Sequence, residues 1–237
     1  MQFAVDKDNN RVWIDDTNSN QTYFCPYCGT VLITRKGEIR RHHFAHQSLN
    51  KCTDSWVRNS KYDESGWHYD WQNEFPADNR EIKLEQGKIK HRADVIIDHT
   101  VIEFQHSLLS ESDFNERNNF YYDLGYKVIW FFDLSDLYES KKISFTAARN
   151  GLAHSWKNPK KYFNAFDVET GAIDLFFQIG KSDKSIVQVT HVSESGFARF
   201  ETTFLMSKAD FLVYVGLKCT IRKNGTAVPL HRCAVPL

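Results

Sequence analysis

The spacing of hydrophobic residues predicts a helix followed by three strands in the middle of the chain. Trp67, Trp71 and Phe75 recur at every fourth position, which is typical of one face of a helix over residues 64–75 that ends at Pro76. Turn residues then separate three strand-like runs, which either alternate or are rich in β-branched residues. The three runs are residues 81–85, 93–97 and 100–104.

A second helix and a fourth strand complete this predicted core. Residues 110–124 read as a helix with Ser110 as its N-cap and Gly125 directly after its end. Residues 127–133 (KVIWFFD) are apolar enough to form a strand that is buried on both faces. The order helix, three strands, helix, strand predicts a mixed α/β core.

The two ends of the chain have other patterns. Weak alternation predicts an amino-terminal hairpin, and the segment from Tyr23 to Cys52 has few large apolar residues for its length. Residues 151–237 are aromatic and β-branched with intervening turn signals, which predicts a β-rich region. We therefore expect three parts, namely residues 1–56, residues 57–150 and residues 151–237.

The overall charge gives no hint of a nucleic-acid partner, but the distribution of charge does. The chain has 237 residues, 41% of them hydrophobic, and its 30 Lys and Arg balance its 30 Asp and Glu. Between residues 21 and 62, basic residues outnumber acidic ones, so we expect this segment to face an anion such as DNA. A solvated loop with incidental lysines is the alternative. The candidate DNA-binding residues are Arg35, Lys36, Arg40 and Arg41.

The sequence predicts a cytoplasmic protein without a membrane-spanning segment. The amino terminus (MQFAVDKDNN) has no apolar stretch typical of a signal peptide, and the longest apolar run, Val128 to Phe132, is too short to span a bilayer. Three of the five cysteines cluster with histidines, which favours metal ligation in a reduced cytosol over a disulfide framework. Cys219 and Cys233 stand apart, and we interpret them as small buried residues.

The clustered cysteines and histidines predict a zinc site. Cys25 and Cys28 form a Cys-x-x-Cys knuckle followed by glycine, which can grip one ion from a tight turn. His46 and Cys52 complete the preferred Cys₃His set, and His43 is the substitute for either distant ligand. Four such ligands with no open position are typical of structural zinc. The alternative is a fortuitous Cys-x-x-Cys with surface histidines.

Acidic residues inside apolar strands mark a second candidate site. Asp94 lies in one predicted strand, and Glu103 and Gln105 project from one face of the next. Acids in apolar strands are costly unless they are paired or bind a metal, and a hard cation such as Mg²⁺ removes the repulsion between two of them. Such a site can hydrolyse phosphodiesters. Alternatively, Asp94 caps a turn and pairs with Arg92 or Arg117, while Glu103 is a solvent-facing edge residue.

A collinear series of motifs spans residues 23–133. It consists of CPYCG, HHFAH, ESGWH, RADVII, IEFQHS, FNER followed by Tyr121, and VIWFFD. This series resembles the competence-associated CoiA-like nuclease family, a branch of the PD-(D/E)XK superfamily. The resemblance implies a restriction-endonuclease-like core, a mixed sheet flanked by helices, preceded by an amino-terminal zinc module.

The resemblance also implies roles for individual residues. Asp94 and Glu103 would bind Mg²⁺ or Mn²⁺, and Gln105 would take the place of the superfamily's lysine. Glutamine lacks the charge of lysine but can orient a water through its amide. The pocket would also be lined by His68, Arg117 and Tyr121. For His68 and Tyr121, packing in the core is the alternative.

We therefore expect a Mg²⁺- or Mn²⁺-dependent nuclease that acts on DNA, in DNA uptake and recombination or in defence against foreign DNA. One alternative is a nucleic-acid-binding module with an inactive site, and another is an interaction protein in which both clusters are structural. DNA cleavage, retention of DNA without cleavage, and no DNA affinity distinguish the three. The sequence assigns no role to residues 151–237, which leave room for an oligomer or protein partner to bind.

Overall fold

In a computed structural model, the strands of the described residues form three separate sheets. The structure describes residues 1–38, 41–48, 52, 66–106, 109–148, 151–155, 173–192, 198–217, 220–223 and 226–229. The chain divides into two compact units, Met1–Glu64 and Ser65–Leu237, and each unit is described below by itself.

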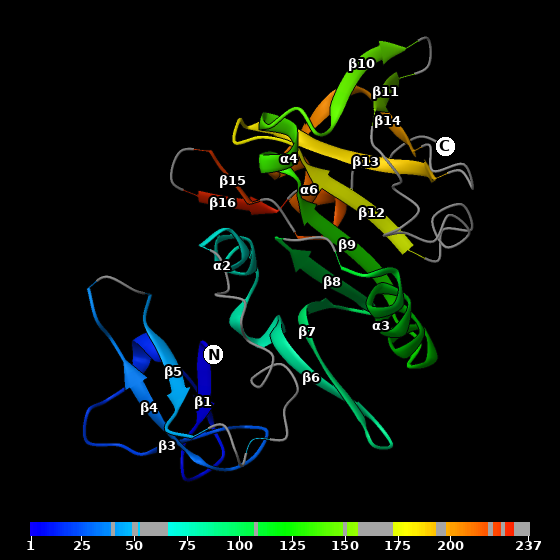
Figure 1. Cartoon of the computed structure of the whole chain (residues 1–237). Helices are drawn as coiled ribbons and strands as arrows, with labels where there is room; N and C mark the ends of the chain where they lie inside the picture. Colours follow the sequence, from blue (N-terminus) through cyan, green and yellow to red (C-terminus); the bar gives the residue numbers. More distant parts are fainter. Residues whose placement is uncertain are drawn as a thin grey trace. The chain divides into compact units, whose positions relative to one another are not determined.

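The amino-terminal unit contains a five-stranded antiparallel sheet in the order β2-β1-β3-β4-β5 (Figure 1). Its strands are β1 (Phe3–Val5), β2 (Arg11–Trp13), β3 (Tyr23–Phe24), β4 (Val31–Arg35) and β5 (His43–His46), and the 3-10 helix η1 (Ile14–Asp16) follows β2. The predicted amino-terminal hairpin is confirmed as β1 and β2. The buried cluster of this unit is small and consists of Ala4, Ile14, Tyr23, Cys25, Leu32, Phe44 and Cys52.

The second unit contains a nine-stranded mixed sheet in the order β10-β11-β14-β13-β12-β9-β8-β7-β6. The pairs β8–β9 and β9–β12 are parallel, and the others are antiparallel. The strands are β6 (Arg80–Gln86), β7 (Ile89–Ile97), β8 (Thr100–Gln105), β9 (Lys127–Asp133), β10 (Ser144–Ala148), β11 (Gly151–Ser155), β12 (Ile173–Gln178), β13 (Lys184–Val192) and β14 (Ala198–Ser207). A separate hairpin consists of β15 (Thr220–Lys223) and β16 (Thr226–Pro229).

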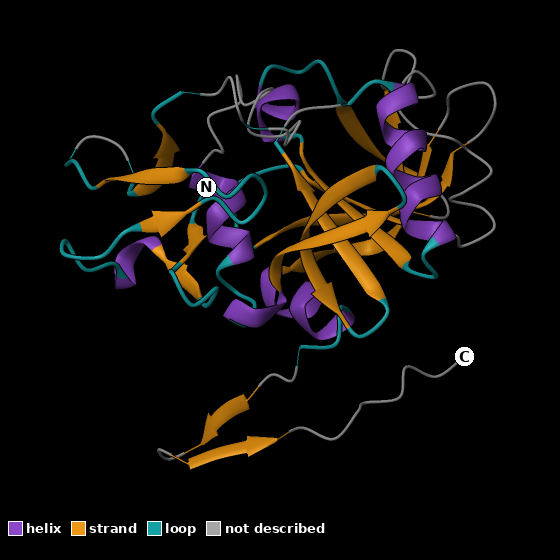
Figure 2. Cartoon of the chain, turned by 90° about the horizontal axis from the view of Figure 1, so that it is seen from below, coloured by secondary structure: helices purple, strands orange, loops and turns teal. Residues whose placement is uncertain are grey.

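Helices cover both faces of this sheet (Figure 2). On one face, α3 (Glu111–Asp123) and α4 (Ser135–Glu139) pack against side chains such as Trp130 and Phe132. On the other face, α2 (Gly66–Gln72) and α6 (Lys208–Tyr214) pack against Phe104, Phe131 and Phe176, and the 3-10 helix η3 (Ala77–Asn79) precedes β6. The run KVIWFFD contributes to both clusters, so the prediction that it is buried on both faces is confirmed.

Most elements predicted for the middle of the chain are confirmed. Helix α3 begins after Ser110, whose hydroxyl accepts a hydrogen bond from the Asp113 N–H at 3.1 Å, and Gly125 follows its end with φ of +81°. The described part of the first predicted helix is α2, which ends before Pro76. The first two residues of that predicted helix, 64 and 65, lie outside the described residues. The mixed α/β prediction is therefore confirmed for this unit.

The carboxy-terminal strands extend the same sheet. Strand β12 pairs in parallel with β9, and β13, β14, β11 and β10 continue outward from it. The sheet thus continues past residue 150, where the sequence suggests a boundary, because the chain returns to the other side of β9 forty residues after that strand ends. The three-part division of the chain stays a prediction.

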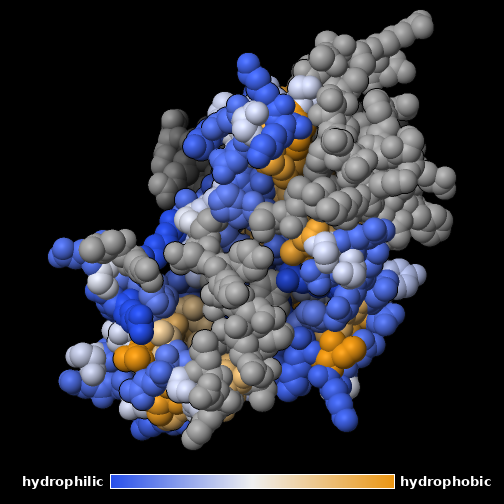
Figure 3. Space-filling view, in the orientation of Figure 1, coloured by the Kyte–Doolittle hydropathy of each residue, from blue (hydrophilic) through white to orange (hydrophobic). Residues whose placement is uncertain are grey.

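The surface that Figure 3 shows is mainly hydrophilic, with separate hydrophobic spots. The large hydrophobic side chains that are exposed among the described residues are Val31, Ile33, Ile89, Tyr122, Tyr138, Val213 and Tyr214. No helix in the described part of the chain combines the length and the apolar character needed to cross a membrane.

Candidate metal centre and candidate active site

The turn after β3 has the knuckle geometry that its sequence predicts. The N–H of Cys25 donates to the carbonyl of Thr30 at 2.8 Å, and the N–H of Gly29 donates to the carbonyl of Cys25 at 2.9 Å. Gly29 has φ of +70°, a left-handed conformation that glycine adopts readily. In other residues, the Cβ would lie too close to a backbone carbonyl oxygen. The turn therefore brings the thiols of Cys25 and Cys28 to one place.

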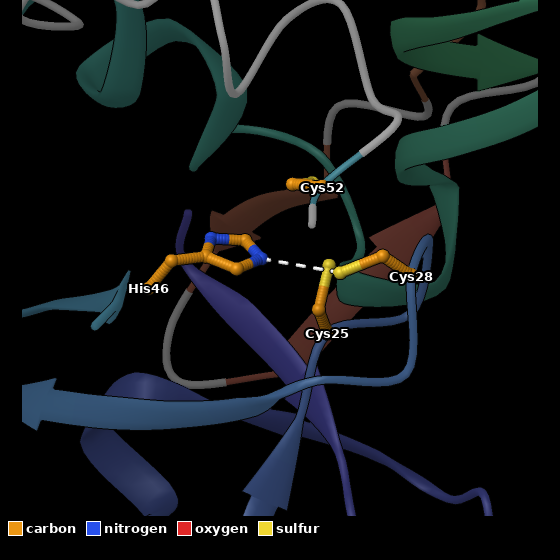
Figure 4. A group of neighbouring side chains, drawn as sticks. All are labelled: Cys25, Cys28, His46 and Cys52. Atoms are coloured by element: carbon orange, nitrogen blue, oxygen red, sulfur yellow. Dashed lines mark hydrogen bonds between the residues drawn. The ribbon is translucent and has the colours of Figure 1, made fainter. Parts of the chain in front are cut away.

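Two further side chains meet these thiols. The ligand atoms of Cys25, Cys28, His46 and Cys52 all lie within 4.8 Å of one another, and Figure 4 shows the four side chains converging. His46 Nε2 lies 3.4 Å from Cys28 Sγ. His43, the proposed substitute, is not in this group, and its Nδ1 lies 2.8 Å from the carbonyl oxygen of Arg41.

The surroundings of the two knuckle thiols set their pKa values apart. Burial raises the pKa of Cys25 to about 12. Burial also opposes ionisation of Cys28, but hydrogen bonds from the side chain and backbone of Thr30 and from His46 outweigh it and lower the pKa of that thiol to about 6. One sulfur is therefore held as a thiolate at neutral pH, the form that binds metal.

These four residues could hold a zinc ion. Three sulfurs and one imidazole nitrogen are the donors that zinc takes in closed tetrahedral sites. Cys25 and Cys52 are almost fully buried, at 1% and 2% exposure, so a bound ion would be part of the core of this unit. The arrangement fits a structural ion.

The second candidate site lies where β7 and β8 separate. Their register pairs Val95 with Ile102, and the next positions outward are Asp94 and Glu103. At that point the Phe104 N–H donates to Asp94 Oδ2 at 2.8 Å, so a side chain occupies the place of a backbone acceptor. The fork brings two buried carboxylates together in the interior of the sheet.

Asp94 is held by helix α2. His68 Nε2 lies 3.3 Å from Asp94 Oδ1, and the Gln72 amide donates to the same oxygen at 3.4 Å. His68 and Gln72 are one helical turn apart, so they project from the same face of α2. The proximity of His68 and Asp94 favours a place for His68 in the site rather than in the apolar core alone.

Glu103 is held by helix α3 on the other side of the sheet. The Tyr121 hydroxyl donates to Oε1 at 2.6 Å, and the Arg117 guanidinium donates to Oε2 at 3.2 Å. Glu103 has no exposed surface, and β8 lies between β7 and β9. The alternative that Glu103 is a solvent-facing edge residue is therefore wrong.

Burial and charge change the acid–base properties of this pair. Burial, followed by the charge of Asp94, raises the pKa of Glu103 to about 7, although Arg117 and Tyr121 act in the opposite direction. Burial and the adjacent Glu103 also raise the pKa of Tyr121 well above its ordinary value, so its hydroxyl remains a donor. The interior of the sheet at this point therefore disfavours ionisation of Glu103 beside Asp94.

The remaining predicted site residues fall in different places. Gln105 lies two residues after Glu103 on β8 and is partly exposed. Arg35 and Lys36 are exposed in the amino-terminal unit, as is Arg41. Arg40 lies outside the described residues.

Two polar residues near Asp94, Gln72 and Glu81, were not foreseen from the sequence. Gln72 could have been found from its spacing of four residues after His68. Glu81 and Arg92 are buried at 2% and 6% exposure, and Arg92 Nη1 lies 3.8 Å from Glu81 Oε2. The β6–β7 register places Glu81 opposite Asp94, and only the paired strands reveal this.

Two family models match the chain, one within each of its two compact units. The family model of the N-terminal domain of competence protein CoiA matches residues 6–55, which include all four residues of the Cys₃His cluster. The family model of the nuclease-like domain of competence protein CoiA matches residues 69–208, more than half of the chain. Comparisons with curated proteins and with solved structures gave no match.

Proposed function

Because the chain belongs to the CoiA-like competence protein family, we propose that it is a Mg²⁺- or Mn²⁺-dependent nuclease that hydrolyses the phosphodiester bonds of DNA. The observation that carries the proposal is the fork between β7 and β8, where Asp94 and Glu103 lie side by side in the core. DNA uptake and recombination is the setting that the family suggests. Defence against foreign DNA is the second setting.

The donor set at the fork fits a hard divalent cation. Two carboxylates, one of them with its pKa raised to about 7, form a buried site that an added positive charge stabilises. Asp94 and Glu103 would hold the ion. A cation bound there would polarise a phosphoryl oxygen of the scissile phosphodiester.

The protein side chains around the fork would position these acids and the reacting groups. His68 and Gln72 orient Asp94 from one face of the sheet, and Arg117 and Tyr121 orient Glu103 from the other. Gln105 projects from the same face of β8 as Glu103, and its amide can orient the attacking water. This arrangement is the basis for proposing a PD-(D/E)XK core.

The Cys₃His cluster supports a separate role for the amino-terminal unit. We propose that it binds zinc structurally and presents Arg35, Lys36, Arg40 and Arg41 to the DNA backbone. Its basic residues and its match to the N-terminal domain of the family support this role. The carboxy-terminal region remains the place through which the chain would form an oligomer or bind a protein partner.

Isosteric substitution at the fork tests the nuclease proposal. Asp94→Asn and Glu103→Gln keep the volume and most hydrogen bonds, but each removes a charge that holds the cation. We expect each variant to lose all measurable cleavage while it retains DNA. The measurement is cleavage of linear, circular, single-stranded and branched DNA by the purified chain, with and without Mg²⁺ or Mn²⁺.

Asp98→Asn is the matched control. Asp98 lies in the exposed turn between the same two strands, has φ of +51°, and its replacement removes one carboxylate in a conformation that asparagine tolerates. The control should cut at the parental rate. Parental cleavage by Asp94→Asn would show that the active site lies elsewhere. DNA binding without cleavage by the parental chain would favour an inactive binding module.

A further inference from the structure

The hairpin that leads to Asp94 extends beyond the sheet. Strand β7 pairs with β8 only over Val95–Ile97, whereas its pairing with β6 continues to Ile89. Residues 83–92 therefore form a two-stranded ribbon that no other described strand joins, which we call the β6–β7 ribbon. Figure 1 shows β6 and β7 continuing together past the other strands to a tight turn.

One face of the β6–β7 ribbon is fixed to the core. Leu84 packs against the cluster beneath α3, and the ring of its register partner His91 lies 4.5 Å from the ring of Phe120. Burial and the charge of Arg117 lower the pKa of His91, which keeps this packed face uncharged. The packing supports a hairpin that would be only marginally stable alone.

The opposite face of the ribbon is charged and leads to the carboxylates. Lys90, Arg92 and Asp94 are two residues apart along β7, so their side chains lie on one face, and the register adds Lys83 and Glu85 from β6 to that face. Lys88 lies in the exposed turn at the tip. In the lower right of Figure 3, the surface in the region of the ribbon is mainly hydrophilic, with a hydrophobic spot.

The charges on this face are available to a polyanion. Lys83 and Lys90 both contact the single acid Glu85, the latter at 3.3 Å, and Lys90 and Glu85 are about half exposed. Surface ion pairs of this kind contribute little and exchange readily for other partners. Arg92, by contrast, is buried beside Glu81, so the contacts with a ligand fall to the exposed lysines Lys88 and Lys90.

We propose that the β6–β7 ribbon is a docking surface for the phosphate backbone of duplex DNA that guides the duplex to the fork. This inference rests on the proposed nuclease function and names a substrate-binding element for it. From Asp94 to Lys88 is six residues, or about 20 Å along an extended strand. A two-stranded ribbon also fits the major groove of B-DNA, where its edge lysines meet phosphates.

The test compares two double variants that remove equal charge. Lys88→Gln/Lys90→Gln neutralises the ribbon, whereas Lys142→Gln/Lys181→Gln neutralises two exposed lysines in loops elsewhere in the same unit. DNA affinity is measured with a short labelled duplex, without divalent cations, between about 50 and 200 mM salt. We expect the ribbon variant to flatten the log–log salt dependence by about one to two units, because each phosphate contact contributes about −0.9. The control should keep the parental slope.

A third variant changes the charge in the opposite direction. Glu85→Gln removes the only acid between the ribbon lysines, so it should tighten DNA binding. Parental slope and affinity in both ribbon variants would overturn the proposal. So would a flattened slope in Arg35→Gln/Lys36→Gln alone, which would place the DNA on the amino-terminal unit.

The outcomes also distinguish this inference from the nuclease proposal. If the parental chain binds DNA through the ribbon but never cuts it, the nuclease proposal fails and the docking surface stands. If the parental chain cuts DNA while the ribbon variants bind and cut at parental levels, the docking surface fails and the nuclease proposal stands. A parental chain without any DNA affinity overturns both.

Discussion

The two candidate sites are built into cores of very different size. Among the described residues of the amino-terminal unit, two of the four candidate ligands, Cys25 and Cys52, belong to a core of only a few apolar side chains. In the second unit, Asp94 and Glu103 are enclosed by a sheet with two large apolar clusters, one on each face. Both units therefore hold polar groups in the interior, but the apolar packing around these groups differs.

The two sites also differ in the hydrogen-bond partners of their polar atoms. Each oxygen of Asp94 and Glu103 has a protein partner, supplied by Phe104 and by helices α2 and α3. The fork can therefore persist without a cation, at the cost of excess negative charge. Among the described residues, the thiols of the amino-terminal unit lie in a smaller apolar cluster, and the partners of Cys25 and Cys28 include the Tyr27 N–H, the Thr30 hydroxyl and the His46 ring. We therefore expect zinc, once bound, to contribute to the stability of the first unit, and a cation at the fork to change only the charge balance of the second.

Loss of a zinc ligand should have the largest effect. We expect Cys25→Ser and His46→Ala to lose the ion and to unfold the amino-terminal unit, because a structural zinc site contributes on the order of 10 kcal/mol. Elemental analysis for zinc and the melting temperature report the change. The parental chain should contain one tightly bound zinc ion, and a well-folded preparation without zinc would contradict the prediction.

His43→Ala is the control for this prediction. His43 is three residues from His46 on β5, yet it lies outside the ligand group. Its replacement should leave zinc content unchanged. Loss of zinc in this variant, with retention in His46→Ala, would exchange the roles of the two histidines.

Local patterns in the sequence predicted the elements that depend on neighbouring residues. The cap at Ser110, the knuckle at Cys25 and the apolar strand at 127–133 each follow from a few adjacent positions, and each is confirmed. The family resemblance is confirmed by both family matches. The pairing of Asp94 with Glu103 could be expected because a tight turn joins their strands.

Features that depend on distant segments could not be predicted. Nothing in residues 173–178 indicates that this strand lies beside β9, because a parallel pairing leaves no local signal. The pair of Glu81 and Arg92 is another case, since it requires the register of β6 and β7. The catalytic roles assigned to Gln105, His68, Arg117 and Tyr121 stay predictions.

A smaller effect is expected from Gln105, which would act on the reaction without holding the carboxylates. Gln105→Met keeps the length of the side chain but removes the amide, and should lower kcat by about 10²- to 10³-fold, as loss of one positioned polar group does elsewhere. Zinc content, melting temperature and the Mg²⁺ concentration at half-maximal rate should be unchanged. Cleavage at the parental rate would exclude the amide from the reaction.

The smallest effect concerns the ionisation of Glu103 at the fork. The pKa of Glu103 is raised from 4.5 to about 7, so the folded state favours the protonated acid. Its contribution to stability is fully present below pH 4.5 and is lost as the pH rises through about 7. Without added divalent cations, the free energy of unfolding should fall across this window by on the order of 3 kcal/mol.

Glu103→Gln isolates this contribution, because it keeps the shape of the side chain and cannot ionise. Unfolding by denaturant at several pH values should give a flatter profile for the variant than for the parental chain between pH 4.5 and 7. Added Mg²⁺ or Mn²⁺ should restore the stability of the parental chain at and above pH 7, since a cation binds the ionised carboxylates, and should not restore it in the variant. Parallel profiles for the two proteins would mean that Arg117 and Tyr121 already neutralise Glu103. The fork would then be satisfied without a cation, and the difference between the two cores would be one of size alone.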